Sequence, residues 1–109
     1  MIAACPLDAL PPGGSLRLAV DPPVAIFRTP TGEIYAIDDT CTHQDASLSD
    51  GWVEGCEVEC PLHSGRFCLR TGAALEPPPL RPVAVFRVEV RDVSVYVFPG
   101  GATGGAAGG

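Results

Sequence analysis

The sequence contains no lysine, so its seven basic side chains are all arginines, set against 13 acidic ones. The net charge of −6 argues against nucleic-acid or anionic-membrane binding, because both require a cationic surface. No apolar run approaches the roughly 20 residues of a membrane span. The N-terminal segment 1–6 also lacks the basic flank and long apolar stretch of a signal peptide. We therefore expect a soluble, cytoplasmic protein that binds neither nucleic acid nor membrane.

Histidine is scarce as well, with two residues in 109, whereas cysteine occurs five times. An odd number of cysteines without a secretory signal argues against a disulfide framework. Helix is disfavoured by 12 prolines and 13 glycines, since both are poorly tolerated in helix interiors. A chain of this length fits one small domain, and that domain is expected to be built from strands.

Short apolar segments with a period of two support this expectation, because alternate side chains of a strand point to the same face. The turn 29–32 is expected to join two strands as a hairpin, and the polar pair Arg91-Asp92 to join the last two. The predicted strands are 15–20, 24–28, 33–38, 56–59, 66–69, 83–90 and 93–98. Many short strands separated by Gly and Pro predict an all-β fold, an antiparallel sandwich or small barrel.

Two segments stand outside this pattern. Residues 99–109 are almost entirely Gly and Ala, cannot bury enough apolar surface to offset their ordering, and are expected to form a disordered tail after a domain spanning 1–98. Residues 39–65 are predicted to be mostly loop, interrupted by one short strand, yet they hold both histidines and three of the five cysteines. A long loop region in a small domain is usually functional.

That region contains two mixed pairs, Cys41-Thr42-His43 and Cys60-Pro61-Leu62-His63, separated by the 16 residues 44–59. Two thiolates and two imidazoles suit either zinc or an iron–sulfur cluster. Structural zinc fingers typically pair Cys with Cys and His with His, whereas each pair here is mixed. The arrangement favours a binuclear cluster with inequivalent irons, and a mononuclear zinc site remains the alternative.

These motifs resemble those of the Rieske family, and most closely the small Rieske ferredoxins of bacterial aromatic-ring-hydroxylating dioxygenase systems, such as those acting on biphenyl or carbazole. The similar segments are 39–43, 59–68 and 70–72. The resemblance implies one [2Fe–2S] cluster, with Cys41 and Cys60 on one iron and His43 and His63 on the other. It also implies a Rieske-type antiparallel β-sandwich or barrel, with a smaller cluster-binding subdomain of about residues 39–76 inserted in it.

The function implied by the resemblance is one-electron transfer by a monomer. Such a ferredoxin takes electrons from an NAD(P)H-dependent ferredoxin reductase and passes them to the terminal oxygenase. The chain is not expected to be an enzyme, because both histidines are committed to the cluster and no G-x-G-x-x-G nucleotide fingerprint is present. The alternatives are a Rieske small subunit of a nitrite reductase and, in a different class, a structural zinc module.

Departures from the respiratory Rieske proteins predict a low reduction potential. Ala46 and Leu62 stand where those proteins carry two cysteines joined in a disulfide, and Gly65 and Phe67 stand where they carry hydroxyl donors to the cluster. Fewer donors stabilise the reduced cluster less. In this family a Pro-rich loop covers the cluster, and the run 77–79 is expected to do so here.

The remaining expectations concern the surroundings of the cluster. Trp52 is predicted to be a buried anchor beneath the cluster loops. Gln44 and Leu62 are expected to contact partners beside the two histidines. Five acidic residues near the cluster form a solvated face that could also steer a basic partner: Asp45, Asp50, Glu54, Glu57 and Glu59. The remaining cysteines, Cys5, Cys56 and Cys68, are assigned structural roles.

Overall fold

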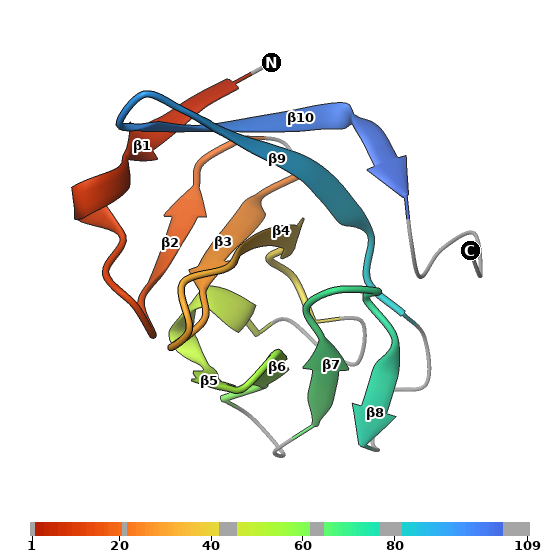
Figure 1. The fold of residues 1–109 in the computed structure, drawn as a ribbon. Coiled ribbons are helices and arrows are strands. Elements are labelled where there is room, and N and C mark those ends of the chain that lie inside the picture. Colours follow the sequence, from red (N-terminus) through yellow and green to blue (C-terminus); the bar gives the residue numbers. More distant parts are fainter. Residues whose placement is uncertain (1, 21, 42–45, 62–64, 77–81, 104–109) are drawn as a thin grey trace.

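The computed structural model describes residues 2–20, 22–41, 46–61, 65–76 and 82–103, the last five by their backbone alone. Six of its strands form one antiparallel sheet in the order β1-β10-β9-β4-β3-β2, which curves around on itself toward a barrel (Figure 1). The strands of this large sheet are β1 (Ile2–Pro6), β2 (Ser15–Leu18), β3 (Val24–Arg28), β4 (Ile34–Asp38), β9 (Val85–Arg91) and β10 (Ser94–Thr103).

A second, smaller sheet lies between β4 and β9 in the chain and has its strands in sequence order, β5-β6-β7-β8. They are β5 (Trp52–Glu54), β6 (Glu57–Glu59), β7 (Arg66–Cys68) and β8 (Ala74–Glu76). Two single 3₁₀ turns, η1 (Leu7–Ala9) and η2 (Leu48–Asp50), are the helical elements among the described residues, and neither could cross a membrane. The all-β prediction is confirmed.

Strand β3 belongs to the large sheet, and both of its faces are buried, so its side chains pack into two hydrophobic cores. Val24 and Ile26 pack with Leu10, Phe86 and Val97 in a core inside the large sheet. Ala25 and Phe27 point the other way, into a second core shared with the small sheet. The uninterrupted apolar run of this strand reflects its burial on both sides. The small sheet, with the loops it carries, is therefore held against the outer face of β3 and β4.

The predicted hairpins form, with one correction. Residues 24–28 and 34–38 pair as β3 and β4 with Arg28 opposite Ile34, as the turn at 29–32 predicts. The last hairpin turns one residue later than expected. Arg91 still pairs with Ser94, so the turn consists of Asp92 and Val93. Asp92 takes a φ of 56°, the left-handed conformation that Asp adopts more readily than most residues.

Strands were missed where the side-chain pattern is weak. β1 contains small residues and a proline, and β5 and β8 have three residues each, too few to display a period. β10 also runs to Thr103 instead of ending at Phe98, the boundary that composition indicates. Thr103 pairs with Val85 beyond an irregularity in the register, so backbone pairing continues into the Gly-rich segment. Residues 104–109 of the predicted tail lie outside the described residues.

Candidate metal centre

The two predicted cysteine ligands occupy equivalent positions in two loops. Cys41 follows the end of β4 and donates its N–H to the carbonyl of Ala46 over 3.0 Å. Cys60 follows the end of β6 and donates its N–H to the carbonyl of Gly65 over 2.7 Å. Each cysteine thus stands at the base of a loop that closes five residues later. We call residues 41–46 the first ligand loop and 60–65 the second.

Both cysteine side chains are buried in the same hydrophobic core. Cys41 is 3% exposed and Cys60 is 1% exposed, and both belong to the core between the sheets, together with Leu48, Val58 and Phe67. A Rieske cluster binds two thiolates on one of its irons, and Cys41 and Cys60 are two thiols that lie in one core. The structure therefore fits the thiolate half of the predicted donor set. His43 and His63 lie outside the described residues, as do residues 77–81 with the three prolines predicted to cover the cluster.

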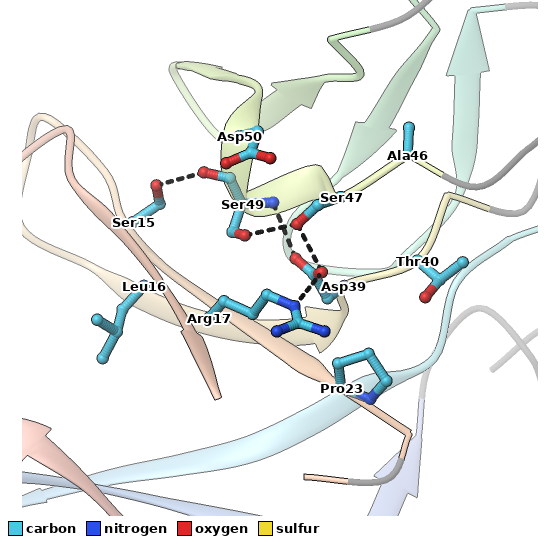
Figure 2. Close-up of a pocket in the computed structure, with 10 residues that line it drawn as sticks. All are labelled: Ser15, Leu16, Arg17, Pro23, Asp39, Thr40, Ala46, Ser47, Ser49 and Asp50. Carbon is cyan, nitrogen blue, oxygen red and sulfur yellow. Dashed lines mark hydrogen bonds and ion pairs between the residues drawn. The ribbon is translucent and has the colours of Figure 1, made fainter. Parts of the chain in front are cut away.

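The first ligand loop is anchored by a buried carboxylate. Asp39 is 2% exposed and accepts three hydrogen bonds: from the Ser47 hydroxyl at 2.6 Å, the Ser49 N–H at 3.0 Å and Arg17 Nε at 3.1 Å. Figure 2 shows Arg17 reaching from β2 while the two serines approach from the opposite side. The Asp39 backbone also takes part, because its carbonyl accepts the Leu48 N–H over 2.7 Å. Asp39 thus ties both ends of the first ligand loop to β2.

This network also keeps Asp39 ionised. Burial by itself would raise the pKa of the carboxyl group, but hydrogen bonds from Ser47, Ser49 and Arg17 outweigh burial and hold the pKa below its ordinary value. The charge is balanced by the neighbouring Arg17 guanidinium, whose side chain is 52% exposed. A paired, fully bonded carboxylate is a firm anchor for the base of a loop.

A hollow of about 620 Å³ opens beside this anchor, between β2 and η2 (Figure 2). Its wall includes Leu16, Pro23, Thr40 and Ala46, in addition to Asp39 and its partners. The Ser15 hydroxyl donates to the Ser49 carbonyl over 2.8 Å and joins β2 to η2 along one side. The hollow therefore adjoins the base of the first ligand loop, and its polar groups serve mainly to hold that loop.

Residues 1–87 match the family model described as the Rieske [2Fe-2S] domain. With two buried cysteines on twin loops beside a nearly closed antiparallel sheet, the chain belongs to the Rieske family, and its cofactor is one Rieske-type [2Fe–2S] cluster. Within the family it is of the small ferredoxin type. It covers 90% of the ferredoxin in the structure described as "Complex of reduced oxygenase and oxidized ferredoxin in carbazole 1,9a-dioxygenase", with a TM-score of 0.83, 39% identity and 88% of this chain aligned.

Two named relatives are ferredoxin subunits of aromatic dioxygenases. The biphenyl dioxygenase ferredoxin subunit of Pseudomonas sp. (strain KKS102) is 48% identical over 84% of this chain and 87% of its own length. The 3-phenylpropionate/cinnamic acid dioxygenase ferredoxin subunit of Photorhabdus laumondii is 43% identical over 85% and 89%. The resemblance to dioxygenase ferredoxins is confirmed. A putative nitrite reductase small subunit from Mycobacterium tuberculosis is less similar, at 27% identity over 88% of this chain and 91% of its own, with a TM-score of 0.79.

One prediction about the surroundings of the site is wrong. Trp52 is 60% exposed and is not a buried anchor. Its neighbour Val53 packs on the core between the sheets, and strand alternation then directs the Trp52 side chain outward. Sequence reasoning also missed the anchoring role of Asp39 and its bonds to Arg17, Ser47 and Ser49. The available signal was an acidic residue two positions before the first ligand, which does not by itself reveal its partners.

Proposed function

We propose that this chain is the one-electron carrier of a bacterial aromatic-ring dioxygenase system, taking electrons from an NAD(P)H-dependent ferredoxin reductase and delivering them to a terminal oxygenase. The proposal rests chiefly on the pair of buried cysteines at the bases of twin loops in a chain that aligns with dioxygenase ferredoxins over almost its whole length. The cluster supplies a site that gains and loses single electrons without a bond being made or broken.

The ligand assignment is part of the proposal. Cys41 and Cys60 hold one iron, and His43 and His63 hold the other. Residues 39–76 form the cluster-binding subdomain of a domain that was predicted to span 1–98 and whose last strand continues to Thr103. The chain works as a cytoplasmic monomer that binds neither nucleic acid nor membrane, in keeping with its net charge of −6 and with a carrier that serves two partners in turn.

Spectroscopy of single variants tests the ligand set. Cys41→Ser, His43→Ala, Cys60→Ser and His63→Ala should each abolish the visible absorption and the reduced-state EPR signal of the wild-type cluster. The matched controls Cys56→Ser and Cys68→Ser remove thiols outside the ligand loops and should retain both signals. A colourless wild-type protein that carries one zinc ion would instead establish the zinc module.

Electron delivery tests the function. The reduced protein should be oxidised by the oxygenase component of a biphenyl dioxygenase, in proportion to hydroxylated product, and should be re-reduced by the reductase component with NADH. The second candidate, a nitrite reductase small subunit, predicts tight association with a sirohaem enzyme and no transfer to the oxygenase. This candidate is considered because the chain is 27% identical to a putative nitrite reductase small subunit of known structure.

A further inference from the structure

The small sheet has two chemically distinct faces. Val58 and Phe67 are fully buried in the core between the sheets, and Val53 packs against them. The alternate residues point away from that core. They are Trp52 and Glu54 on β5, Glu57 and Glu59 on β6, and Arg66 and Cys68 on β7. We call these six residues the outer face.

The outer face carries more negative charge than it neutralises. Arg66 Nη1 bonds Glu54 at 2.9 Å and Glu57 at 3.4 Å, and its Nη2 bonds Glu59 at 3.1 Å. Three carboxylates against one guanidinium leave an excess of two negative charges. Both amino groups of Arg66 already have carboxylate partners, and Glu54 remains 79% exposed. This face therefore attracts cations from solution and has no arginine to offer to an acidic partner.

Trp52 stands at one end of this charged surface. It lies opposite Glu59 in the β5–β6 register, and Glu59 in turn lies opposite Arg66. The indole gains little by folding, because 60% of the residue stays in water. β5 is also the first strand of its sheet, with no neighbour on its outer side among the described residues. A large aromatic side chain left exposed among charges is typical of binding hot spots.

Trp52, Glu59 and Arg66 form a row across β5, β6 and β7. This row lies at the base of the second ligand loop. Glu59 immediately precedes Cys60, and Arg66 immediately follows Gly65, whose carbonyl closes the loop. A molecule bound on this row would stand next to Cys60 and the base of the second ligand loop. Electron transfer slows steeply with distance, so an encounter at this place is suited to a carrier.

We propose that the outer face is a docking site for the cationic surface of a redox partner protein, with Trp52 as its apolar anchor against an arginine or lysine side chain. The inference rests on the proposed function and names the surface through which it operates. The carboxylates draw the partner in by long-range attraction, and the indole supplies apolar area and a cation–π contact once water is displaced. The electron then passes singly from the reduced protein to the partner.

Stopped-flow kinetics with Trp52→Ser test the anchor. The probes are the oxygenase and reductase components of a biphenyl dioxygenase, together with cytochrome c as a cationic acceptor. The second-order rate constant should fall about tenfold with at least one probe, and Trp52→Phe should recover most of it. Val93→Ser is the matched control, because Val93 is 71% exposed at the β9–β10 turn and should have no effect. The absorption spectrum and reduction potential of Trp52→Ser should match the wild type.

The contribution of the outer-face carboxylates can be measured separately, because it depends on salt concentration. Glu54→Gln should slow electron transfer about twofold to threefold at low salt, and the effect should vanish near 0.5 M salt because the charges are then screened. The loss in Trp52→Ser should persist at high salt. Asp8→Asn on η1 removes the same charge from an exposed residue elsewhere and should have little effect. Since Trp52 is the only tryptophan, 5-fluorotryptophan labelling should give one ¹⁹F resonance that shifts when the oxygenase is added.

The outcomes separate the two proposals. If the wild type serves the dioxygenase components and Trp52→Ser matches it within twofold with all three probes, the docking inference is overturned and the carrier function stands. If the wild type serves neither component, the carrier function fails. The rates with cytochrome c then decide the docking inference by the same twofold criterion.

Discussion

The Ser47 hydroxyl donates a hydrogen bond to the Asp39 carboxylate over 2.6 Å, although the first ligand loop separates the two residues in sequence. Thr40 bridges to Ser47 just inside this bond, and the N–H of Cys41 bonds the carbonyl of Ala46 one step further in. The loop is thus closed by successive contacts, of which the outermost depends on a buried charge. These contacts hold the two described ends of the loop, residues 39–41 and 46–47, against each other.

Asp39→Asn should destabilise the protein by about 1–3 kcal/mol, because one oxygen becomes an NH₂ group facing donors in a buried place. The variant should also lose its cluster faster when challenged with a chelator, since the first ligand loop is less firmly held. Urea unfolding and the decay of visible absorption measure the two effects. Asp8→Asn, which changes an exposed carboxylate, is the control. Unchanged stability in Asp39→Asn would show that the anchor is dispensable.

The same carboxylate predicts a pH dependence of stability. The pKa of Asp39 is lower in the folded protein than in the unfolded chain, so its ionisation stabilises the fold above the unfolded pKa of about 4. That contribution is lost as pH falls through the lower, folded pKa. The stability difference between wild type and Asp39→Asn should therefore be constant from pH 7 to about pH 5 and shrink below it. Glu33 and Glu89 also have lowered pKa values, but their contributions are common to both proteins.

Gly72 is expected to tolerate no side chain. Its φ is +79°, and a Cβ there would lie 2.1 Å from the Val83 carbonyl oxygen. Gly72→Ala should therefore cost more than the roughly 1–2 kcal/mol of placing alanine in the left-handed region. Gly55→Ala is the matched control, because Gly55 has a φ of +59° and a Cβ added there would meet no atom within 4 Å. Thermal unfolding of both variants measures the difference, and equal losses would contradict the clash.

The reduction potential should lie near the low end of the range of about −150 to +300 mV found for Rieske centres. Phe67 is fully buried and Gly65 has no side chain, so neither position offers a hydroxyl to the cluster. Protein-film voltammetry measures the potential, and a value well above 0 mV would refute the prediction. Phe67→Tyr, which adds a hydroxyl at one of these positions, should raise the potential relative to wild type.

The potential should also fall at alkaline pH. The remaining N–H of an imidazole bound to oxidised iron ionises at lower pH than the N–H of a free neutral imidazole, because the nearby cation stabilises the imidazolate. Deprotonation stabilises the oxidised form, so the potential decreases as pH rises. Voltammetry from neutral to strongly basic pH measures the slope, and a flat profile would show that His43 and His63 are not both bound to iron.

Sequence patterns predicted the features that depend on neighbouring residues. The uninterrupted apolar run of β3 and the turn before β4 were readable because strand burial and turn geometry are local properties. The motif predicted Cys41 and Cys60 as ligands because few chemistries use that spacing, and the ligand assignment stays a prediction. Trp52 was misjudged because its direction depends on the phase of a three-residue strand, which is set by the pairing of β5 with β6. The partners of Asp39 were not predictable, since Arg17 reaches it from 22 positions away.

One face of β3 packs into each hydrophobic core, so the core inside the large sheet and the core between the sheets both depend on this strand. Neither can open without exposing a strand that the other needs, so denaturation should proceed in a single step with no partly melted species. A substitution that weakens the packing of β3 should therefore lower the stability of both sheets together.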